Sequence, residues 1–409
     1  MDLLKNIFKG DKVIWIIFLV LCLISIIEVF SAASTLTYKS GDHWAPIRQH
    51  GLFLMAGAGL VVLFHNIQYK WFQVFPVFLL PISVVLLALV MMMERINGAA
   101  RWMTFMGVQF QPSEIAKMAV IIVTAFILSK GQTEEGANPK AFKRILIIVS
   151  VICLLIAPEN LSTAALLFGV VVMMMFIGRV SIRKLLILIG SLGSIGIIAV
   201  TFLLVTKNSD IPFLHRFDTW RARIERFTSD KQVPAAKFDI DKDAQIAHAR
   251  IAVATSHVIG KGPGNSVQRD FLSQAFSDFI FAIIVEELGL AGGAIVVFLY
   301  ICLLIRVGRI AKKCDRTFPS LLIIGIALLL VSQAIFNMMV AVGLAPVTGQ
   351  PLPLISKGGT STLINCVYIG IILSVSRYTA QLEEVPEESQ IQTSAEPTAE
   401  VLNNDDQLV

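Results

Sequence analysis

The chain has 409 residues, of which 56% are hydrophobic and 15% are charged, with a formal net charge of +5. Because a soluble domain carries about 25% charged residues, this composition excludes a soluble globular enzyme, a disordered protein and a secreted disulfide scaffold. A polytopic membrane protein remains. The five cysteines show no Cys-x-x-Cys spacing, so we infer neither a metal site nor a disulfide framework from them.

The hydrophobic runs predict an all-α protein with about ten transmembrane helices. A helix needs roughly 20 apolar residues to span a bilayer, and its backbone groups must bond within the segment. The predicted spans are 13–33, 50–66, 72–93, 114–129, 144–157, 161–178, 184–205, 278–305, 318–342 and 358–376. The first run is longer than the apolar region of a signal peptide, which has roughly 7–15 residues, so we predict a retained helix.

One alternative topology concerns the fifth and sixth spans, which are separated only by Pro158-Glu159-Asn160. If these two spans formed a single long broken helix, the chain would cross the membrane nine times. The two termini would then lie on opposite sides.

Lysine and arginine in the short loops predict the orientation. With the N-terminus inside, the inner loops carry most of these residues, and the outer short loops hold only Lys39, Arg48, Arg95 and Arg101. We therefore expect both termini in the cytoplasm. The resulting parts are a cytoplasmic N-terminus (1–12), transmembrane helices 1–7 (13–205), an extracytoplasmic loop between helices seven and eight (206–277), transmembrane helices 8–10 (278–376) and a disordered acidic tail in the cytoplasm (377–409).

Polar residues at membrane depth are costly to bury and therefore indicate candidate functional sites. Glu114 and Lys117 follow Pro112, which suits a first helical turn, and at a spacing of three they can form a structural ion pair. Alternatively, Lys117 and Arg101 receive an anionic group. The segment 158–163 predicts a turn whose Asn, Ser and Thr side chains cap the sixth span.

The long loop is rich in basic residues, including Arg216, Lys261 and Arg269. These residues form either a solvated face or a surface that attracts lipid phosphates. The glycine-rich segment 260–266 predicts a turn, and it lacks the P-loop pattern of nucleotide-binding proteins.

Acidic residues occur at the start of the eighth span. Asp278 is expected either to cap the helix or to act as a functional acid. Glu286 and Glu287 lie about two turns further along, so we expect them deeper in the membrane. Charges at that depth need partners, and Lys357, in the loop before the tenth span, is a candidate.

Four motifs in this order resemble the SEDS family (shape, elongation, division and sporulation proteins), and most closely its FtsW branch. They are RW…FQPSEIAK at 101–117, GKGPGNSVQR at 260–269, SDFIFAIIVEELGLAG at 277–292 and NMMVAVGLAPVTGQPLPLISKGGTS at 337–361. The resemblance implies a peptidoglycan glycosyltransferase that polymerises lipid II, a disaccharide-pentapeptide on undecaprenyl diphosphate, on the outer face of the cytoplasmic membrane during cell division. The implied partners are a class B penicillin-binding protein and divisome membrane proteins, and no nucleic acid is expected.

Asp278 occupies the position of the essential acid of this family, in SDFIF where many members read TDFIF. The chain departs from the family pattern at several positions. Phe276 and Ser277 replace a His and a Thr, Asn160 stands where many members carry Asp, and Lys357 stands where many have Tyr. Lys357 therefore adds a positive charge beside the expected site.

Glycosyl transfer from a diphosphate-linked sugar needs a general base, and Asp278 is our candidate. Cations must stabilise the departing diphosphate. The predicted substrate-binding residues are Arg101, Glu114, Lys117, Arg216, Lys261, Arg269 and Lys357. A divalent cation (Mg or Mn) could assist, although the sequence shows no ligand set for one.

Two other functions suit the same composition, a lipid II flippase and a non-catalytic division scaffold. A flippase needs polar groups along a path through both leaflets, whereas the motif residues gather on the predicted outer side. A scaffold would tolerate the loss of Asp278.

Overall fold

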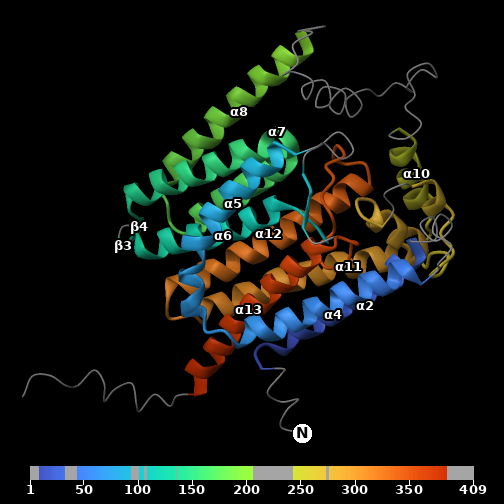
Figure 1. Ribbon diagram of the computed structural model, residues 1–409, viewed down its shortest axis with the longest axis horizontal. Coiled ribbons are helices and arrows are strands. Elements are labelled where there is room, and N and C mark those ends of the chain that lie inside the picture. The colour runs from blue at the N-terminus through green and yellow to red at the C-terminus, as the bar shows by residue number, and fades with distance from the viewer. Residues whose placement is uncertain are drawn as a thin grey trace, which may run out of the picture.

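The computed structural model describes residues 9–32, 44–93, 101–105, 108–134, 136–205, 243–272 and 276–384, which are almost entirely helical (Figure 1). Its long helices are α2 (Lys12–Ala32), α4 (Ala45–Asn66), α5 (Phe75–Met91), α6 (Pro112–Lys130), α7 (Pro139–Ile177), α8 (Ile182–Val205), α11 (Ile280–Lys312), α12 (Thr317–Ala341) and α13 (Thr360–Glu384). The shorter elements are η1 (Tyr69–Gln73), α10 (Asp243–Ala254), η4 (Gln268–Phe271), and two antiparallel pairs, β1 (Met103–Phe105) with β2 (Val108–Phe110) and β3 (Gln132–Thr133) with β4 (Gly136–Ala137). Arg216 lies outside the described residues.

The structure confirms the expected all-α fold of a multi-pass membrane protein. Seven of the described helices are long and apolar enough to cross a membrane, namely α2, α4, α6, α7, α11, α12 and α13. Large apolar side chains such as Leu52 and Phe298 are exposed on the surface of the bundle, as lipid-facing residues are. The count of ten crossings stays a prediction.

Helix α7 is one 39-residue element, but it folds back on itself at Asn160, whose φ of −151° and ψ of 79° are not helical. In a straight helix, Cys153 and Ala164 would lie about 16 Å apart, yet the Cys153 Sγ lies 3.4 Å from the Ala164 carbonyl oxygen. Beyond its two ends, the Ala137 amide donates to the Arg179 carbonyl at 3.0 Å. This antiparallel hairpin agrees with separate fifth and sixth spans.

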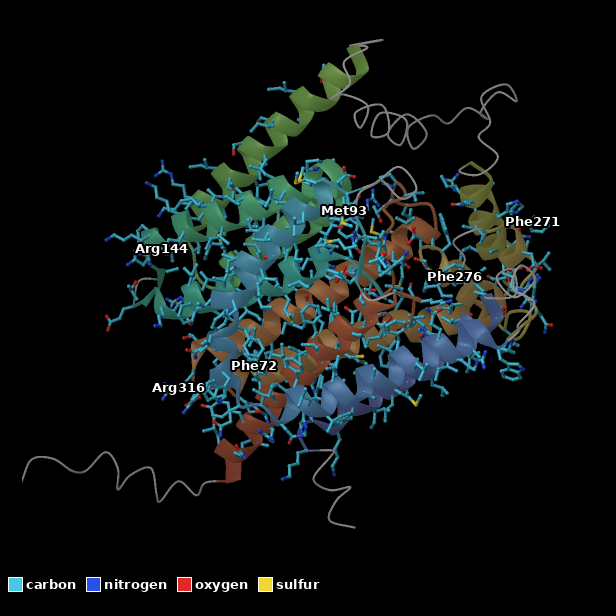
Figure 2. All side chains as sticks on the ribbon, in the orientation of Figure 1. Phe72, Met93, Arg144, Phe271, Phe276 and Arg316 are labelled. Carbon is cyan, nitrogen blue, oxygen red and sulfur yellow. The ribbon has the colours of Figure 1, made fainter. Side chains whose placement is uncertain are left out.

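Both ends of the described chain meet at one end of the bundle, here called the basic end. The Asp11 amide donates to the Ser376 hydroxyl at 2.7 Å, and the Asp11 carboxylate pairs with Arg306 at 2.7 Å. Arg144 and Arg316 lie toward the same end (Figure 2). This arrangement disfavours the nine-crossing alternative, which would separate the termini.

The C-terminal boundary differs from the prediction. Helix α13 continues to Glu384, so the first residues of the expected tail (377–409) are helical. Arg377 explains part of this extension, since its guanidinium donates to the Asn66 carbonyl at 3.1 Å. Residues 385–409 lie outside the described residues.

The centre of the bundle is formed by α6, α12 and α13, whose apolar side chains such as Ile121, Leu330 and Ile371 are almost fully buried. Helix α8 leans away from the other helices (Figure 1). The end opposite the basic end, here called the site end, gathers the polar segments described below.

Candidate functional site

Helix α11 begins with a short segment, Ile280–Leu288, that turns back at Gly289. Gly289 has a φ of +75° and a ψ of −178°, and these backbone angles are not helical. A Cβ on Gly293 would lie 2.8 Å from Val285 Cγ2 and 3.5 Å from Phe281 Cζ, although a straight helix would hold those residues about 12 and 18 Å away. The long straight part of α11 therefore starts after Gly289, and Asp278 precedes a short helical segment that folds back on it.

The turn at Gly289 corrects the expected straight path from Asp278 to the two glutamates. Glu286 and Glu287 lie just before this turn, and both are fully buried. Lys357 is not their partner. Glu286 pairs with Lys261, and Glu287 lies 3.9 Å from Arg269 Nη1.

Hydrogen bonds also join the turn at Gly289 to the 257–268 loop. The Glu286 carboxylate accepts the Val267 amide at 3.2 Å and the Gln268 amide at 3.3 Å. The Glu287 carboxylate accepts the Gly264 amide at 2.9 Å and the hydroxyl of Ser31, at the end of α2. Buried carboxylates are stable when they are paired and hydrogen-bonded in this way, so Lys261 and Arg269 act here as structural cations.

Two glycines allow the backbones of the loop and the turn to touch. Gly260 has a φ of +78°, and a Cβ there would lie 2.3 Å from the Gly289 nitrogen. A Cβ on Gly289 would lie 2.2 Å from the Val258 carbonyl oxygen. The predicted turn at 260–266 is confirmed, and its glycines are required by close approach and by positive φ.

A second irregular segment, the 350–357 loop, packs into the site end between α12 and α13. Several of its backbone carbonyls accept hydrogen bonds from side chains of neighbouring helices, as buried non-helical backbone requires. Gln333 donates to the Pro351 carbonyl at 3.1 Å, Ser25 to that of Ile355 at 2.6 Å, and Asn337 to that of Gln350 at 2.7 Å.

Asp278 is held between these two irregular segments. Its backbone carbonyl accepts Asn337 Nδ2 at 2.9 Å, and its carboxylate accepts the Ser277 hydroxyl at 3.0 Å. The Ser356 hydroxyl donates to the Ser277 carbonyl at 2.6 Å. Asp278 does not cap the helix, because α11 begins at Ile280 and its N-cap residue, Phe279, makes no side-chain cap bond.

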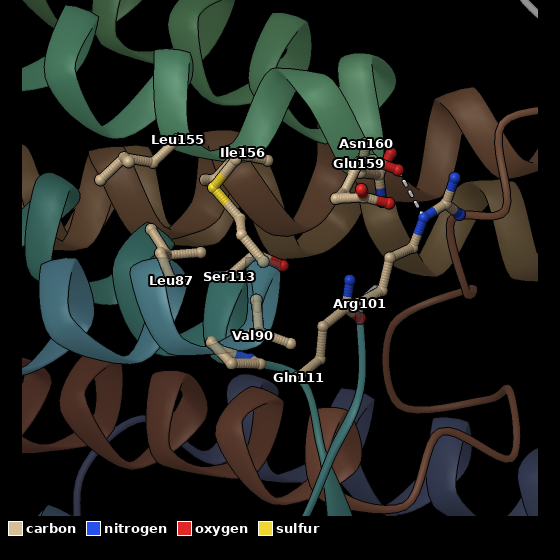
Figure 3. A pocket seen from close by; sticks show the side chains of 11 residues that line it. Leu87, Val90, Arg101, Gln111, Ser113, Leu155, Ile156, Glu159 and Asn160 are labelled. Carbon is tan, nitrogen blue, oxygen red and sulfur yellow. Dashed lines mark hydrogen bonds between the residues drawn. The ribbon is translucent and has the colours of Figure 1, made fainter. Parts of the chain in front are cut away.

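Arg101 reaches the same place from the segment before β1. A Cβ on Gly349 would lie 3.5 Å from Asp278 Oδ2 and 3.6 Å from Arg101 Nη1, so the two charged groups border one small space. The Arg101 Nε donates to the Glu159 carbonyl at 2.6 Å, beside the α7 turn (Figure 3). Of the caps expected there, that of Asn160 is confirmed, since its carboxamide oxygen accepts the Thr163 amide at 3.2 Å, whereas the Thr163 hydroxyl accepts a hydrogen bond from Gln350.

Glu114 and Lys117 form the structural ion pair, with 2.7 Å between them and side chains 3% and 0% exposed. Lys117 also donates to Gln333 at 3.1 Å. This pair therefore joins α6 to α12 beneath the 350–357 loop. We find no reason to assign either residue to substrate.

Lys357 differs from Lys117, Lys261 and Arg269, which have acidic partners. Within the part of the chain that the structure describes, it makes no salt bridge, and its ammonium lies 5.5 Å from the Phe276 ring centroid. Its amide donates to the Phe276 carbonyl at 2.9 Å, which places it next to the Asp278 segment. Burial holds the pKa of Lys357 below the ordinary lysine value.

Several residues that frame Asp278 were missed by the sequence reasoning. Gln333 and Asn337 lie four apart in the predominantly apolar helix α12, and this spacing places both on one face. That signal was available. Gly349 and Gln350 lie in the motif at 337–361, but their contacts were not readable, because only the fold brings Gln350 to Thr163 on α7.

Among the described residues, no group of three or more His, Cys, Asp or Glu side chains could hold a divalent metal.

The sequence profile of the cell cycle proteins FtsW, RodA and SpoVE matches residues 11–381. The chain is 30% identical over 384 residues to the probable peptidoglycan glycosyltransferase FtsW of Geobacter metallireducens, covering 91% of this chain and 96% of that protein. It is 32% identical over 370 residues to the protein of the same description from Halomonas elongata, covering 88% and 89%.

Solved structures share the fold. A chain from a study of polymerization and crosslinking by a peptidoglycan synthase complex aligns with a TM-score of 0.72 at 22% identity, covering 91% of this chain and 99% of that chain. The rod shape determining protein RodA of Thermus thermophilus aligns with a TM-score of 0.64 at 22% identity, covering 91% and 98%.

Proposed function

Because the chain belongs to the FtsW, RodA and SpoVE family of cell cycle proteins, we propose that it is a peptidoglycan glycosyltransferase. Its substrate is lipid II, which it polymerises on the outer face of the cytoplasmic membrane during division. The observation that carries the proposal is the approach of Asp278 and Arg101 to one space beside Gly349. A base and a cation on either side of one small space suit displacement of a diphosphate by a sugar hydroxyl.

In the reaction, Asp278 removes the proton of the acceptor hydroxyl as its oxygen bonds to the anomeric carbon of the donor. A positioned general base typically contributes about 10²–10⁴-fold to the rate. Ser277 and Asn337 orient this segment, through the carboxylate and the backbone carbonyl of Asp278 respectively.

The bond from the anomeric carbon to the diphosphate breaks in the same step, and its electron pair leaves with the diphosphate. Arg101 and Lys357 stabilise this charge, because preformed cations act most strongly in a site shielded from water. The leaving group needs no proton, so one carboxylate suffices, and direct displacement inverts the anomeric centre.

The other predicted cations have different roles in this proposal. Lys117, Lys261 and Arg269 have acidic partners and hold the framework. A class B penicillin-binding protein is the proposed partner. The basic end, where both ends of the described chain lie, faces the cytoplasm.

The proposal is tested with purified protein and its partner in liposomes that carry labelled lipid II. We expect glycan strands from the wild-type protein, and at least a hundredfold less from Asp278→Asn. Transfer of lipid II between leaflets without polymer would identify a flippase. Polymer that is unchanged in the variant would indicate that Asp278 is not the base.

A further inference from the structure

A buried histidine on α4, His50, is linked by hydrogen bonds to the 350–357 loop. The side chains of His50 and of Ser25, on α2, are both fully buried. His50 Nε2 lies 2.7 Å from the Ser25 hydroxyl oxygen, and that oxygen lies 2.6 Å from the Ile355 carbonyl oxygen. A continuous path of hydrogen bonds therefore leads from α4 through α2 to the loop. The catalytic step described above uses neither side chain.

The direction of each hydrogen bond follows from the donors available. A carbonyl oxygen only accepts, so the single hydroxyl proton of Ser25 is donated to Ile355. The Ser25 oxygen then accepts the other bond, and His50 Nε2 carries the proton that is donated to it. Among the described residues, His50 Nδ1 has no hydrogen-bond partner. A proton on that buried nitrogen would have no acceptor, so His50 is a neutral donor with its proton on Nε2.

Ser25 has a competing use for its hydroxyl. A serine within a helix can donate to a carbonyl of the preceding turn, as Ser194 does to Gly190 in α8 at 2.9 Å. The bond from His50 anchors the Ser25 oxygen on the side away from its own helix backbone. The hydroxyl proton of Ser25 therefore stays directed at Ile355.

The bond at Ile355 holds a strained part of the loop. Leu354 has a φ of +66°, a left-handed conformation that leucine rarely adopts and that persists only where neighbouring contacts hold it. The peptide group between Ile355 and Ser356 is held at both polar atoms. Ser25 binds its carbonyl, and its amide donates to the Leu352 carbonyl at 2.9 Å. Loss of the Ser25 bond would allow the loop to relax at Leu354.

The end of the loop holds the segment that carries Asp278. The Ser356 hydroxyl donates to the Ser277 carbonyl at 2.6 Å, and the Lys357 amide donates to the Phe276 carbonyl at 2.9 Å. A shift of the loop therefore moves the carboxylate relative to the attacking hydroxyl. A misplacement of about 1 Å can lower a rate by about 10²-fold.

Building on the proposed function, we propose that His50 is a positioning residue for the reaction at Asp278, acting through Ser25 and the Ile355 carbonyl. It touches neither the substrate nor the base. Its contribution is to keep the loop in the conformation that aligns Asp278. The loss of such a residue lowers kcat more than it raises KM, because the base is displaced while Arg101 stays in place.

The test compares two neutral amides at position 50. His50→Gln places an N–H donor near the position of Nε2, whereas the shorter His50→Asn places it near that of Nδ1, out of reach of Ser25. The kinetics of lipid II polymerisation are measured with the purified full-length protein and its partner. We expect His50→Asn to lower kcat by about tenfold or more, with a KM close to the wild-type value. His50→Gln should restore most of kcat.

The matched control is His65→Asn, the same substitution on the same helix. His65 is also fully buried but lies about 22 Å along α4 from His50, and its loss should leave kcat unchanged. A second line of evidence is Ser25→Ala, which removes the middle of the path. The double variant Ser25→Ala/His50→Asn should be no slower than Ser25→Ala alone, because both changes act through one bond. Thermal unfolding of each variant verifies its folding.

Hydrogen exchange of the Ser356 amide gives a readout that does not depend on activity. His50→Asn should accelerate this exchange and His50→Gln should not, since the loop loosens only when Ser25 loses its donor. Equal kcat for the two variants, or an equal loss in His65→Asn, would overturn the inference. So would a double variant that is slowed by the product of the two single losses.

These outcomes are separable from the proposed function. If the wild-type protein makes no glycan from lipid II, the glycosyltransferase proposal fails, and the exchange rates alone decide whether His50 holds the loop. If glycan is made and neither kcat nor exchange responds to His50→Asn, the inference about His50 fails alone.

Discussion

The buried pair of Glu114 and Lys117 offers a test of the framework beneath the site. The perturbation is Lys117→Met, which keeps the length of the side chain and removes its charge. The Glu114 carboxylate, 3% exposed, then loses the cation 2.7 Å away. The double variant Glu114→Leu/Lys117→Met removes both charges and is the matched control.

The magnitude follows from the geometry. At an effective dielectric constant of about 20, two charges 2.7 Å apart attract by about 6 kcal/mol, and burial of the two ions costs several kcal/mol each. The net contribution of the pair is therefore small. Breaking it leaves the full burial cost of one ion, and we expect Lys117→Met to lower the free energy of unfolding by about 3–5 kcal/mol.

The double variant should be more stable than Lys117→Met, since no buried charge remains. Both variants lose the Lys117 bond to Gln333, so that loss cancels in the comparison. Thermal unfolding of the purified protein in detergent, followed by size-exclusion chromatography, measures the order of stability. A double variant that is less stable than Lys117→Met would refute the reasoning.

Three further predictions concern the loops around the site. Gly349→Ala places a methyl group between Asp278 and Arg101, at a residue whose φ is +68°. We therefore expect at least a tenfold loss of polymerisation rate in lipid II assays. A normal rate would show that the substrate does not use this space. Gly260→Ala should lower the unfolding temperature far more than Gly264→Ala, which has a similar φ of +83° but open space around it; equal shifts would contradict the interlocked turn. Because burial lowers the pKa of Lys357, its side chain loses its positive charge at a lower pH than that of an ordinary lysine. The KM for lipid II should therefore rise as the pH increases through that pKa. Lys357→Arg, which stays charged, should abolish the rise.

Much of the fold was predictable because apolar runs of membrane length have few structural solutions. The reversal at Asn160 was also readable, since Pro158 and Asn160 interrupt an apolar run too long for one crossing. The reversal at Gly289 was not predicted. Its sequence is continuous with the following span, and the conformation depends on contact with Gly260 in a distant loop.

The candidate site was predictable in its residue types and less so in its pairings. Asp278 and Arg101 are brought together, while Lys261 and Arg269 are used by Glu286 and Glu287. The prediction assigned those glutamates to Lys357, because it assumed that α11 runs straight from Asp278 inward. Once the helix folds back at Gly289, the glutamates move to the turn, and Lys357 remains beside Asp278.

The central claim is that the Asp278 carboxylate takes a proton from the attacking hydroxyl. The most direct measurement is the initial rate of lipid II polymerisation by Asp278→Asn at saturating substrate, together with its affinity for lipid II. We predict a rate at least a hundredfold lower with affinity within a few-fold of the wild-type value. A rate close to that of the wild-type protein, at equal affinity, would contradict the account.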